Sequence, residues 1–264
     1  MKNIVEPLIV TATPNISWLN PEVKYPMSPE EFAEEAKQVE KAGASIIHIH
    51  AQGMWTAAIR EIRKSSNLII QCGMSSLSLK ERLDVFTEKA DMISIMLGHH
   101  DEAFVKQDFH VLHPREELLE YASLTKKYGV KPEFEVWHTG HIWNLNYLIN
   151  KGAVQMPYFA TLFFGWPGGN WTPPTIEEYL YRRRQMPTGG VINVSVMGKE
   201  QIKVLTASII MGDHVRVGTE DNPFIGDRLA TNAELVAQIV DIAKSIGRKI
   251  ASPSEAAKII GISR

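Results

Sequence analysis

Short β-rich apolar runs alternate with longer runs of helical period along almost the whole chain. The β-rich runs predict eight strands, over residues 8–13, 45–51, 68–73, 92–97, 132–139, 159–165, 191–196 and 214–221. The helical runs predict helices over residues 28–43, 54–64, 78–90, 114–129, 141–151, 175–186, 199–212 and 232–248, with a last small helix in SPSEAAKIIGI. Strand and helix therefore alternate eight times.

This alternation indicates the fold class. Strands that are apolar throughout and joined by helices indicate a parallel sheet covered on both faces. Eight such units close most naturally into a (β/α)8 TIM barrel, and a doubly wound open sheet is the alternative. No linker-like change of composition divides the chain. We therefore expect one α/β domain over residues 1–264, with a short C-terminal helix.

The composition narrows the class of protein. Hydrophobic residues make up 44% and charged residues 22% of the chain, which is typical of globular proteins and excludes disordered and fibrous classes. The net charge of -2 provides no field that would attract nucleic acid or an anionic membrane. The single cysteine, Cys72, excludes an intramolecular disulfide and a thiolate-rich metal site. We expect a soluble cytoplasmic protein that binds neither nucleic acid nor membrane.

The stretch SIIHIHAQG, residues 45–53, indicates where the chemistry lies. Side chains alternate along a strand, so His48 and His50 share a face. In a barrel the active site lies at the carboxyl ends of the strands. Two imidazoles and one carboxylate with an open position form a common catalytic metal site. Glu220, at the end of the eighth strand, is the natural third ligand, and we predict Zn²⁺ there, with another divalent ion as the alternative.

Several segments resemble the β-keto acid cleavage enzymes, a family that includes 3-keto-5-aminohexanoate cleavage enzymes. The resemblance covers nearly the full length of the chain. It is carried by PLIVTA, SPEEFAEEAKQVEKAGASIIHIHA, PEFEVWHTG, FFGWPGG, HVRVGTEDNPF and LVAQIVDIAKSIGRKIASPSEA.

The resemblance implies a zinc-dependent TIM barrel that converts a β-keto acid and acetyl-CoA into acetoacetate and an acyl-CoA. It implies that His48, His50 and Glu220 ligate the metal, that Asp221 takes a proton from the substrate, and that Arg216 lies near the reacting carboxylate. It also implies a homo-oligomer, a tetramer. Strict alternation would turn Asp221 away from Glu220, so these roles require the chain to turn after Gly218.

The sequence departs from the family pattern around the substrate. Gln52 stands where the family usually has an arginine, and the segment before the third strand is shorter. Pro14-Asn15-Ile16 replaces a motif that includes the acid for the substrate's amino group. Two hydroxyl positions align with Gly73 and His99. We therefore expect a substrate other than 3-keto-5-aminohexanoate, with a pocket formed by Gly73, Ser75, Ser76, His99 and Glu135.

Other polar residues have two interpretations. His138 and His141 could extend the metal site or begin a helix. Five tryptophans in or beside strand-end loops could hold a bulky apolar or cationic group, or pack within the protein: Trp55, Trp137, Trp143, Trp166 and Trp171. Arg182, Arg183 and Arg184 are expected to be solvated or paired with Glu177 and Glu178.

Two rival functions remain. One is a metal-dependent aldolase or lyase of the same fold that uses no CoA. The other is a non-catalytic barrel that binds a small acid around a structural zinc. Acetoacetate formation that requires acetyl-CoA would distinguish the first interpretation from both rivals.

Overall fold

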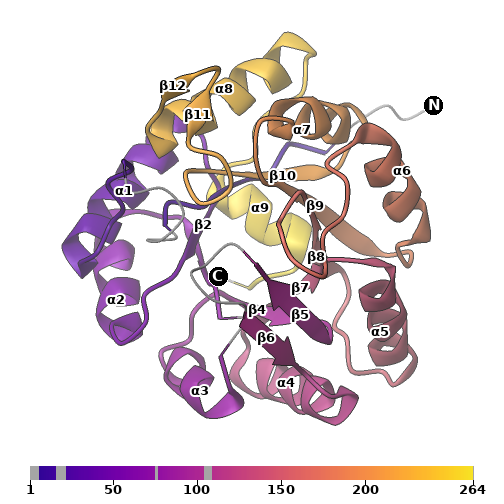
Figure 1. Cartoon of the computed structure of the whole chain (residues 1–264). Helices are drawn as coiled ribbons and strands as arrows, with labels where there is room; N and C mark the ends of the chain where they lie inside the picture. The colour runs from indigo at the N-terminus through magenta and orange to yellow at the C-terminus, as the bar shows by residue number, and fades with distance from the viewer. Residues whose placement is uncertain (1–5, 16–21, 75–76, 104–108, 264) are drawn as a thin grey trace.

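The computed structural model describes residues 6–15, 22–74, 77–103 and 109–263. Its centre is a closed barrel of eight parallel strands in the order β1-β10-β9-β8-β7-β4-β3-β2 (Figure 1). These strands are β1 (Val10–Ala12), β2 (Ile46–Ile49), β3 (Ile69–Cys72), β4 (Met92–Met96), β7 (Lys131–Val136), β8 (Tyr158–Phe164), β9 (Gly190–Val196) and β10 (His214–Val217). The predicted (β/α)8 barrel is confirmed, and the open sheet is wrong because β1 pairs with both β2 and β10.

Eight helices surround the barrel (Figure 1): α1 (Pro29–Ala42), α2 (Trp55–Ser65), α3 (Leu79–Thr87), α4 (Arg115–Tyr128), α5 (Thr139–Asn150), α6 (Ile176–Gln185), α7 (Gln201–Ile210) and α8 (Asn232–Ser245). Local sequence signals fix their ends. In α1 the Ser28 side chain accepts a hydrogen bond from the Glu31 amide, Pro29 occupies the first turn, and Gly43 ends the helix with φ of 116°.

A ninth helix, α9 (Pro253–Ile260), closes the amino-terminal end of the barrel. Its Ala256, Ala257 and Ile260 pack against apolar side chains that point into the barrel from the starts of the strands, including Ile9, Ile46, Ile69, Met92 and Phe159. Because this end is filled with apolar side chains, a ligand can reach the interior only from the opposite end. The predicted C-terminal helix is confirmed.

The middle of the barrel is polar and is organised around Glu133. Gln71 and Thr161 donate hydrogen bonds to this fully buried carboxylate, and Ser94 donates another at 2.9 Å. Burial and the nearby Glu135 raise the pKa of Glu133 to about 7, against the opposing effect of Arg216. This polar belt lies directly beneath the carboxyl-terminal end of the barrel.

Two β-hairpins that the apolar pattern did not predict follow barrel strands. After β4, the strands β5 (His99–Glu102) and β6 (Phe109–Leu112) pair antiparallel. After β10, the strands β11 (Phe224–Ile225) and β12 (Arg228–Leu229) form a second, smaller hairpin. The expected strand over residues 214–221 ends earlier, at Val217, and the chain turns at Gly218 as the proposed site requires. Both hairpins therefore stand at the active-site end of the barrel.

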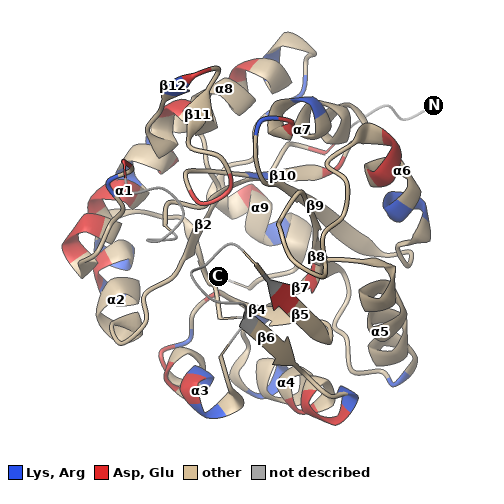
Figure 2. Ribbon diagram, viewed as in Figure 1, with Lys and Arg blue, Asp and Glu red and all other residues tan. Residues whose placement is uncertain are grey.

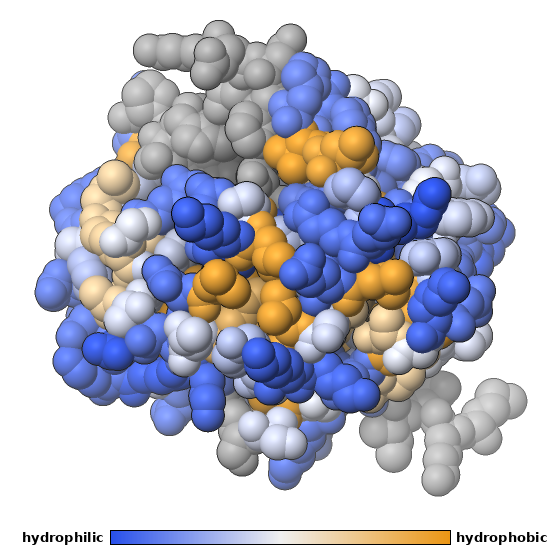
Figure 3. All heavy atoms as spheres, turned by 90° about the horizontal axis from the view of Figure 1, so that it is seen from below, coloured by the Kyte–Doolittle hydropathy of each residue, from blue (hydrophilic) through white to orange (hydrophobic). Residues whose placement is uncertain are grey.

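The outer surface is mainly polar. Figure 2 shows acidic and basic residues on the outer helices and few of them on the barrel strands. On the face that carries α3 and α4, hydrophilic side chains interrupt the apolar ones (Figure 3). Among the described residues, no helix is both long and apolar enough to cross a membrane.

Candidate metal centre

His48 and His50 lie side by side at the end of β2, as the alternation predicts. Their Nε2 atoms are 3.1 Å apart, and the rings meet edge to face with centroids 4.9 Å apart. Gly73, after β3, makes room for both rings, since a Cβ atom there would lie 2.5 Å from His48 Nε2 and 2.6 Å from His50 Cε1. The Asn15 side chain forms two hydrogen bonds with the His50 backbone. Its nitrogen donates to the carbonyl oxygen at 2.8 Å, and its oxygen accepts from the amide at 3.0 Å. A glycine on the neighbouring strand is therefore necessary for this pair of imidazoles.

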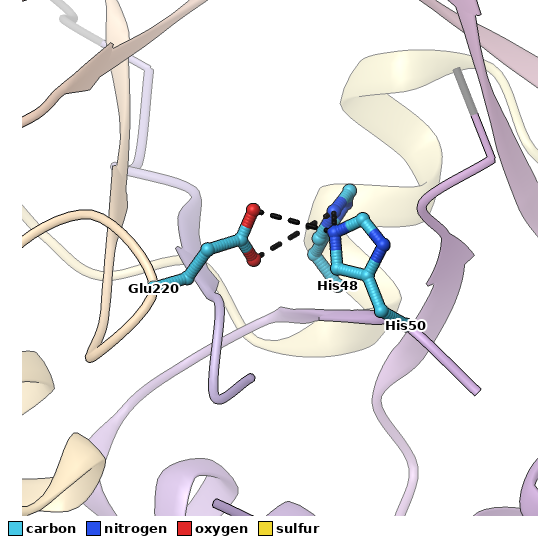
Figure 4. A group of neighbouring side chains, drawn as sticks. All are labelled: His48, His50 and Glu220. Carbon is cyan, nitrogen blue, oxygen red and sulfur yellow. Dashed lines mark hydrogen bonds and ion pairs between the residues drawn. The ribbon is translucent and has the colours of Figure 1, made fainter. Parts of the chain in front are cut away.

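Glu220 approaches the histidines from the opposite side (Figure 4). Its Oε1 lies 3.3 Å from His50 Nε2, and its Oε2 lies 3.9 Å from His48 Nε2. The Thr13 hydroxyl donates a hydrogen bond to Oε2. Gly218 brings the chain to this position because a Cβ atom there would meet the Thr13 backbone oxygen at 2.2 Å. The close approach to β1, rather than a left-handed conformation, thus requires glycine at this turn.

The donor set fits a divalent metal ion. Four ligands around tetrahedral zinc lie about 3.4 Å from one another, which follows from metal–ligand distances near 2.1 Å. The three distances observed here are 3.1, 3.3 and 3.9 Å. Burial keeps the pKa of His48 well below its ordinary value, so this ring is neutral, whereas Arg216 and the two histidines hold the pKa of Glu220 low against the effect of burial. Neutral imidazole and ionised carboxylate are the forms that bind metal.

The side of the site away from the histidines is formed by Arg216 and Asp221. Arg216 Nη2 contacts Glu220 Oε1 at 2.5 Å and Asp221 Oδ1 at 2.8 Å. Ser195 donates a 3.0 Å hydrogen bond to Asp221. Burial raises the pKa of Asp221 to about 6, with Arg216 opposing and Glu220 adding to the effect. A buried carboxylate with this pKa is ionised near neutral pH and is still basic enough to accept a proton.

An aromatic wall stands beside Arg216. It consists of Met96, Trp137, Phe163 and Trp166, all buried. Trp137 stacks on Phe163 with ring centroids 4.3 Å apart, and its indole N–H donates to Glu135 at 3.1 Å. Glu135 is therefore paired, as expected for a buried carboxylate. Trp143 and Trp171 are exposed instead, 58% and 53%, and do not belong to this wall.

The other proposed pocket residues have different surroundings. The His99 side chain is exposed at the start of β5, while its carbonyl oxygen accepts hydrogen bonds from His141 and Asn170. Ser75 and Ser76 lie outside the described residues. The substrate contacts of all three residues stay predictions.

His138 and His141 do not extend the metal site. His138 caps α5 by accepting a hydrogen bond from the Gly140 amide at 3.0 Å. His141 uses both ring nitrogens, accepting from the Trp137 amide at 3.2 Å and contacting the His99 carbonyl at 2.9 Å. Burial lowers the pKa of His141 to about 3, which keeps this ring neutral. Both histidines therefore fix the loops around the site.

The expectation that the arginines of α6 are solvated is wrong for Arg182. This side chain is fully buried, where it donates hydrogen bonds to the carbonyl oxygens of Val136, Trp137 and Phe163. The expected ion pair with Glu178 forms at 3.4 Å. Arg183 pairs instead with Asp213, at 2.6 Å. Arg182 thus ties together the strand ends that carry the aromatic wall.

Sequence reasoning missed four side chains that support the site: Thr13, Asn15, Gln71 and Ser195. They belong to β1, β3 and β9 or to the segments that follow. The inward alternation of each strand was the available signal, because it places small polar residues at the level of the histidines. Cys72 is a free, buried cysteine, and burial raises the pKa of its thiol, which keeps it protonated and unreactive.

The sequence profile described as "beta-keto acid cleavage enzyme" matches residues 7–262. The chain belongs to the β-keto acid cleavage enzyme family. It is accordingly an enzyme of a family whose members are acetyl-CoA-dependent transferases that cleave carbon–carbon bonds. The resemblance that the sequence motifs carried is thereby confirmed.

Named relatives agree with this assignment, and a solved structure shares the fold. The chain is 34% identical to the 3-keto-5-aminohexanoate cleavage enzyme of Acetoanaerobium sticklandii, over 93% of each chain. It is 27% identical to the 3-dehydrocarnitine:acetyl-CoA trimethylamine transferase of Rhizobium meliloti, over 87% of each. The apo structure of ObcA superposes with a TM-score of 0.77 at 15% identity, covering 91% of this chain and 66% of that one, so this chain spans slightly less than two thirds of that protein.

Proposed function

We propose that this enzyme cleaves a β-keto acid in an acetyl-CoA-dependent reaction at a zinc ion held by His48, His50 and Glu220. The observation that best supports this proposal is the buried group of two imidazoles and one carboxylate, with Arg216 and Asp221 directly beside it. When bound, the ion supplies Lewis acidity toward the substrate's keto and carboxylate oxygens. Another divalent ion, such as Mn²⁺, bound in place of zinc is the alternative.

The chain's own residues divide the remaining work. Arg216, which is buried and charged, orients the substrate carboxylate and holds Asp221 in position through two nitrogen atoms. Asp221 takes a proton from the carbon between the keto and carboxylate groups. That carbon then forms a bond to the acetyl carbonyl, and CoA leaves as a thiolate. The thiolate attacks the original keto carbon, and the old carbon–carbon bond breaks to leave the enolate of acetoacetate. Asp221 returns its proton to that carbon, and acetoacetate and an acyl-CoA are released.

The substrate chain is proposed to be uncharged. Residues 14–21, PNISWLNP, contain no acidic side chain, and the amide of Asn15 is used by the His50 backbone. The aromatic wall of Met96, Trp137, Phe163 and Trp166 provides apolar surface beside Arg216. An apolar chain gains from this surface, whereas an ammonium group would lose its hydration beside apolar side chains and the positively charged Arg216.

A matched pair of substrates tests this proposal. 3-Oxohexanoate and 3-keto-5-aminohexanoate differ only by the amino group. We expect the zinc-loaded enzyme to form acetoacetate from both only when acetyl-CoA is supplied, with the higher kcat/KM for 3-oxohexanoate. Product without acetyl-CoA would support the lyase instead. Bound zinc without turnover on a broad panel would support the binding protein. A higher kcat/KM for the amino compound would contradict the uncharged substrate.

A further inference from the structure

The side chains of the proposed site are closed off from solvent. Arg216, Glu220 and Asp221 are each no more than 3% exposed, and the aromatic wall beside them is buried as well. A substrate chain that packs on this wall therefore needs a segment of the protein to move away first. That segment has to contact the wall, and the bonds that hold it have to open easily.

Hairpin β5–β6 lies directly against the aromatic wall. The His100 ring of β5 meets the Trp137 indole edge to face, with ring centroids 4.3 Å apart. Val111 of β6 packs against the same apolar cluster. His100 and Val111 are directly opposed in the hairpin and so share a face. Both strands therefore cover the apolar surface that the substrate chain is proposed to use.

Hydrogen bonds join this hairpin to the loop over residues 165–171, which follows β8. The Ala103 amide donates to the Pro167 carbonyl at 3.1 Å, and the Asn170 side chain donates to the His99 carbonyl at 2.9 Å. The same loop contributes a tryptophan to the aromatic wall. The hairpin is thus held in place by a loop that itself forms part of the wall.

A third hydrogen bond to this loop uses a carboxylate. Asp101 Oδ2 accepts from the Gly169 amide at 2.7 Å, and Asp101 Oδ1 lies 3.2 Å from His110 Nδ1 on β6. A Cβ atom at Gly169 would lie 2.2 Å from Asp101 Oδ2, so glycine is needed for the carboxylate to reach this amide. Asp101 and His110 are partly exposed, and water can therefore replace these bonds when the hairpin moves.

The base of the hairpin has the features of a hinge. Gly98 joins β4 to β5 with a φ of 133°, a conformation that favours glycine. Its carbonyl oxygen accepts a hydrogen bond from the His113 amide at 3.0 Å, which holds the two ends of the hairpin together. A hairpin that is joined at its base and held further along by Asp101 can move as one unit.

We propose that hairpin β5–β6 is a lid, which moves away from the loop to admit the β-keto acid to the aromatic wall and then closes over it. The hydrogen bond between Asp101 and Gly169 is its latch. The inference rests on the proposed function, because it concerns the entry of that reaction's substrate. Asp101 is a positioning residue, since it acts through the lid rather than on the substrate.

A reversible disulfide tests the lid. A Cβ atom at Gly169 would lie 3.5 Å from Asp101 Cβ, a separation that a disulfide spans. The double variant Asp101→Cys, Gly169→Cys should therefore cross-link the lid in its closed position, and the natural Cys72 is buried. We expect oxidation to lower kcat/KM for the β-keto acid at least about 100-fold, and reduction by tris(2-carboxyethyl)phosphine to restore it.

The two single variants, Asp101→Cys and Gly169→Cys, are the controls, because neither can form this cross-link and neither should respond to the oxidant. Mass spectrometry shows whether the disulfide is present. A cross-linked enzyme that keeps the kcat/KM of its reduced form would overturn the lid. Failure of the double variant to cross-link under the oxidant would contradict the contact between Asp101 and Gly169.

A double-mutant cycle tests the latch. Asp101→Ala and Gly169→Ala should each raise the KM for the β-keto acid about fivefold and leave kcat within about twofold of wild type, because each breaks the same hydrogen bond. The double variant should be no worse than either single variant. Asp101→Asn keeps an oxygen that accepts from the Gly169 amide and should stay near wild type. Additive effects of the two alanine substitutions would contradict the latch.

Hydrogen exchange separates this inference from the proposed function, because it needs no turnover. Asp101→Ala should speed amide exchange about fivefold in residues 99–103 and 165–171, but not in α9 at the opposite end of the barrel. Unchanged exchange in both segments would overturn the lid, whatever the activity. Faster exchange in both segments of a protein that forms no acetoacetate would contradict the proposed function and leave the lid standing.

Discussion

At the residue scale, the proposed site depends on how the two histidine rings are placed relative to the barrel interior and its opening. His48 is 1% exposed and His50 is 27% exposed, so one ring faces the interior and the other borders the opening. The sequence alone indicated both ligands, because their spacing of two places them on one face of a strand. The third ligand lies 170 residues away and could be named only by assuming a closed barrel.

Gly73→Ala should weaken metal binding more than about tenfold, although neither the ligands nor the charge changes. A Cβ atom at this position would lie 2.5 Å from His48 Nε2, so the ring must move away from Glu220. Zinc affinity measured by competition with a chelator checks this. Wild-type affinity in Gly73→Ala would show that the imidazoles have room that the structure does not indicate.

Asp221→Asn should lower kcat by at least about 100-fold and leave zinc stoichiometry at the wild-type value, because it removes a base but no metal ligand. The amide oxygen can still accept the hydrogen bond from Arg216, and the amide nitrogen can donate to the Ser195 hydroxyl oxygen. Steady-state kinetics and elemental analysis on the same sample provide both numbers. Turnover within a few-fold of wild type would exclude Asp221 as the base.

At the element scale, the strands bring polar side chains together from distant parts of the chain. The alternation of β7 showed that Glu133 and Glu135 share a face with Trp137. It could not show that Gln71, Ser94 and Thr161 would surround Glu133, because these residues come from three other strands. The partners of an inward-facing side chain depend on strand order and register, which the chain's own periodicity does not contain.

Helix α6 and the hairpin β5–β6 show the same limit. Tyr179 and Arg182 are three residues apart and share the buried face of α6, but a charged side chain on a polar helix looks exposed from sequence. The strands of the hairpin, HHDE and FHVL, do not alternate apolar with polar residues. Their position is set by contacts such as the Asn170 hydrogen bond to the His99 carbonyl.

Gln71→Leu should lower zinc affinity about tenfold relative to Ser94→Ala. Both substitutions remove one donor to Glu133, but only Gln71 lies beside His48 in the register of β2 and β3, where its amide raises the pKa of that ring. His48 Nδ1 and Gln71 Oε1 are both buried. A proton on Nδ1 directed at this oxygen would leave Nε2 free to bind metal. Equal losses of zinc affinity in the two variants would mean that Gln71 acts only as a donor to Glu133 and does not orient His48.

At the scale of the whole molecule, buried neutral histidines link stability to pH. His214 accepts a hydrogen bond from the Ile9 amide at 2.9 Å, and burial lowers its pKa from 6.5 to about 3. The unfolded chain therefore binds more protons than the folded one between these values. The stabilisation is complete above pH 6.5 and is lost as the pH falls.

His214→Asn keeps an acceptor for the Ile9 amide and removes the titration. We expect the free energy of unfolding, measured in EDTA from pH 6.5 to 4.5, to fall less steeply in this variant, by up to about 1.4 kcal/mol per pH unit. His141, whose pKa is also lowered by burial, contributes equally to the pH dependence of the unfolding free energy in both proteins. His110→Asn, at a histidine that is 60% exposed, is the control and should match wild type. A slope that is unchanged in His214→Asn would mean that His214 does not contribute to acid unfolding.

The most direct test of the proposed metal site is anomalous diffraction at the zinc absorption edge from crystals equilibrated with zinc. We expect an anomalous peak between the Nε2 atoms of His48 and His50 and the carboxylate of Glu220, and loss of that peak in His48→Ala. Zinc-equilibrated crystals without a peak at this position, or a stoichiometric peak retained in His48→Ala, would contradict it.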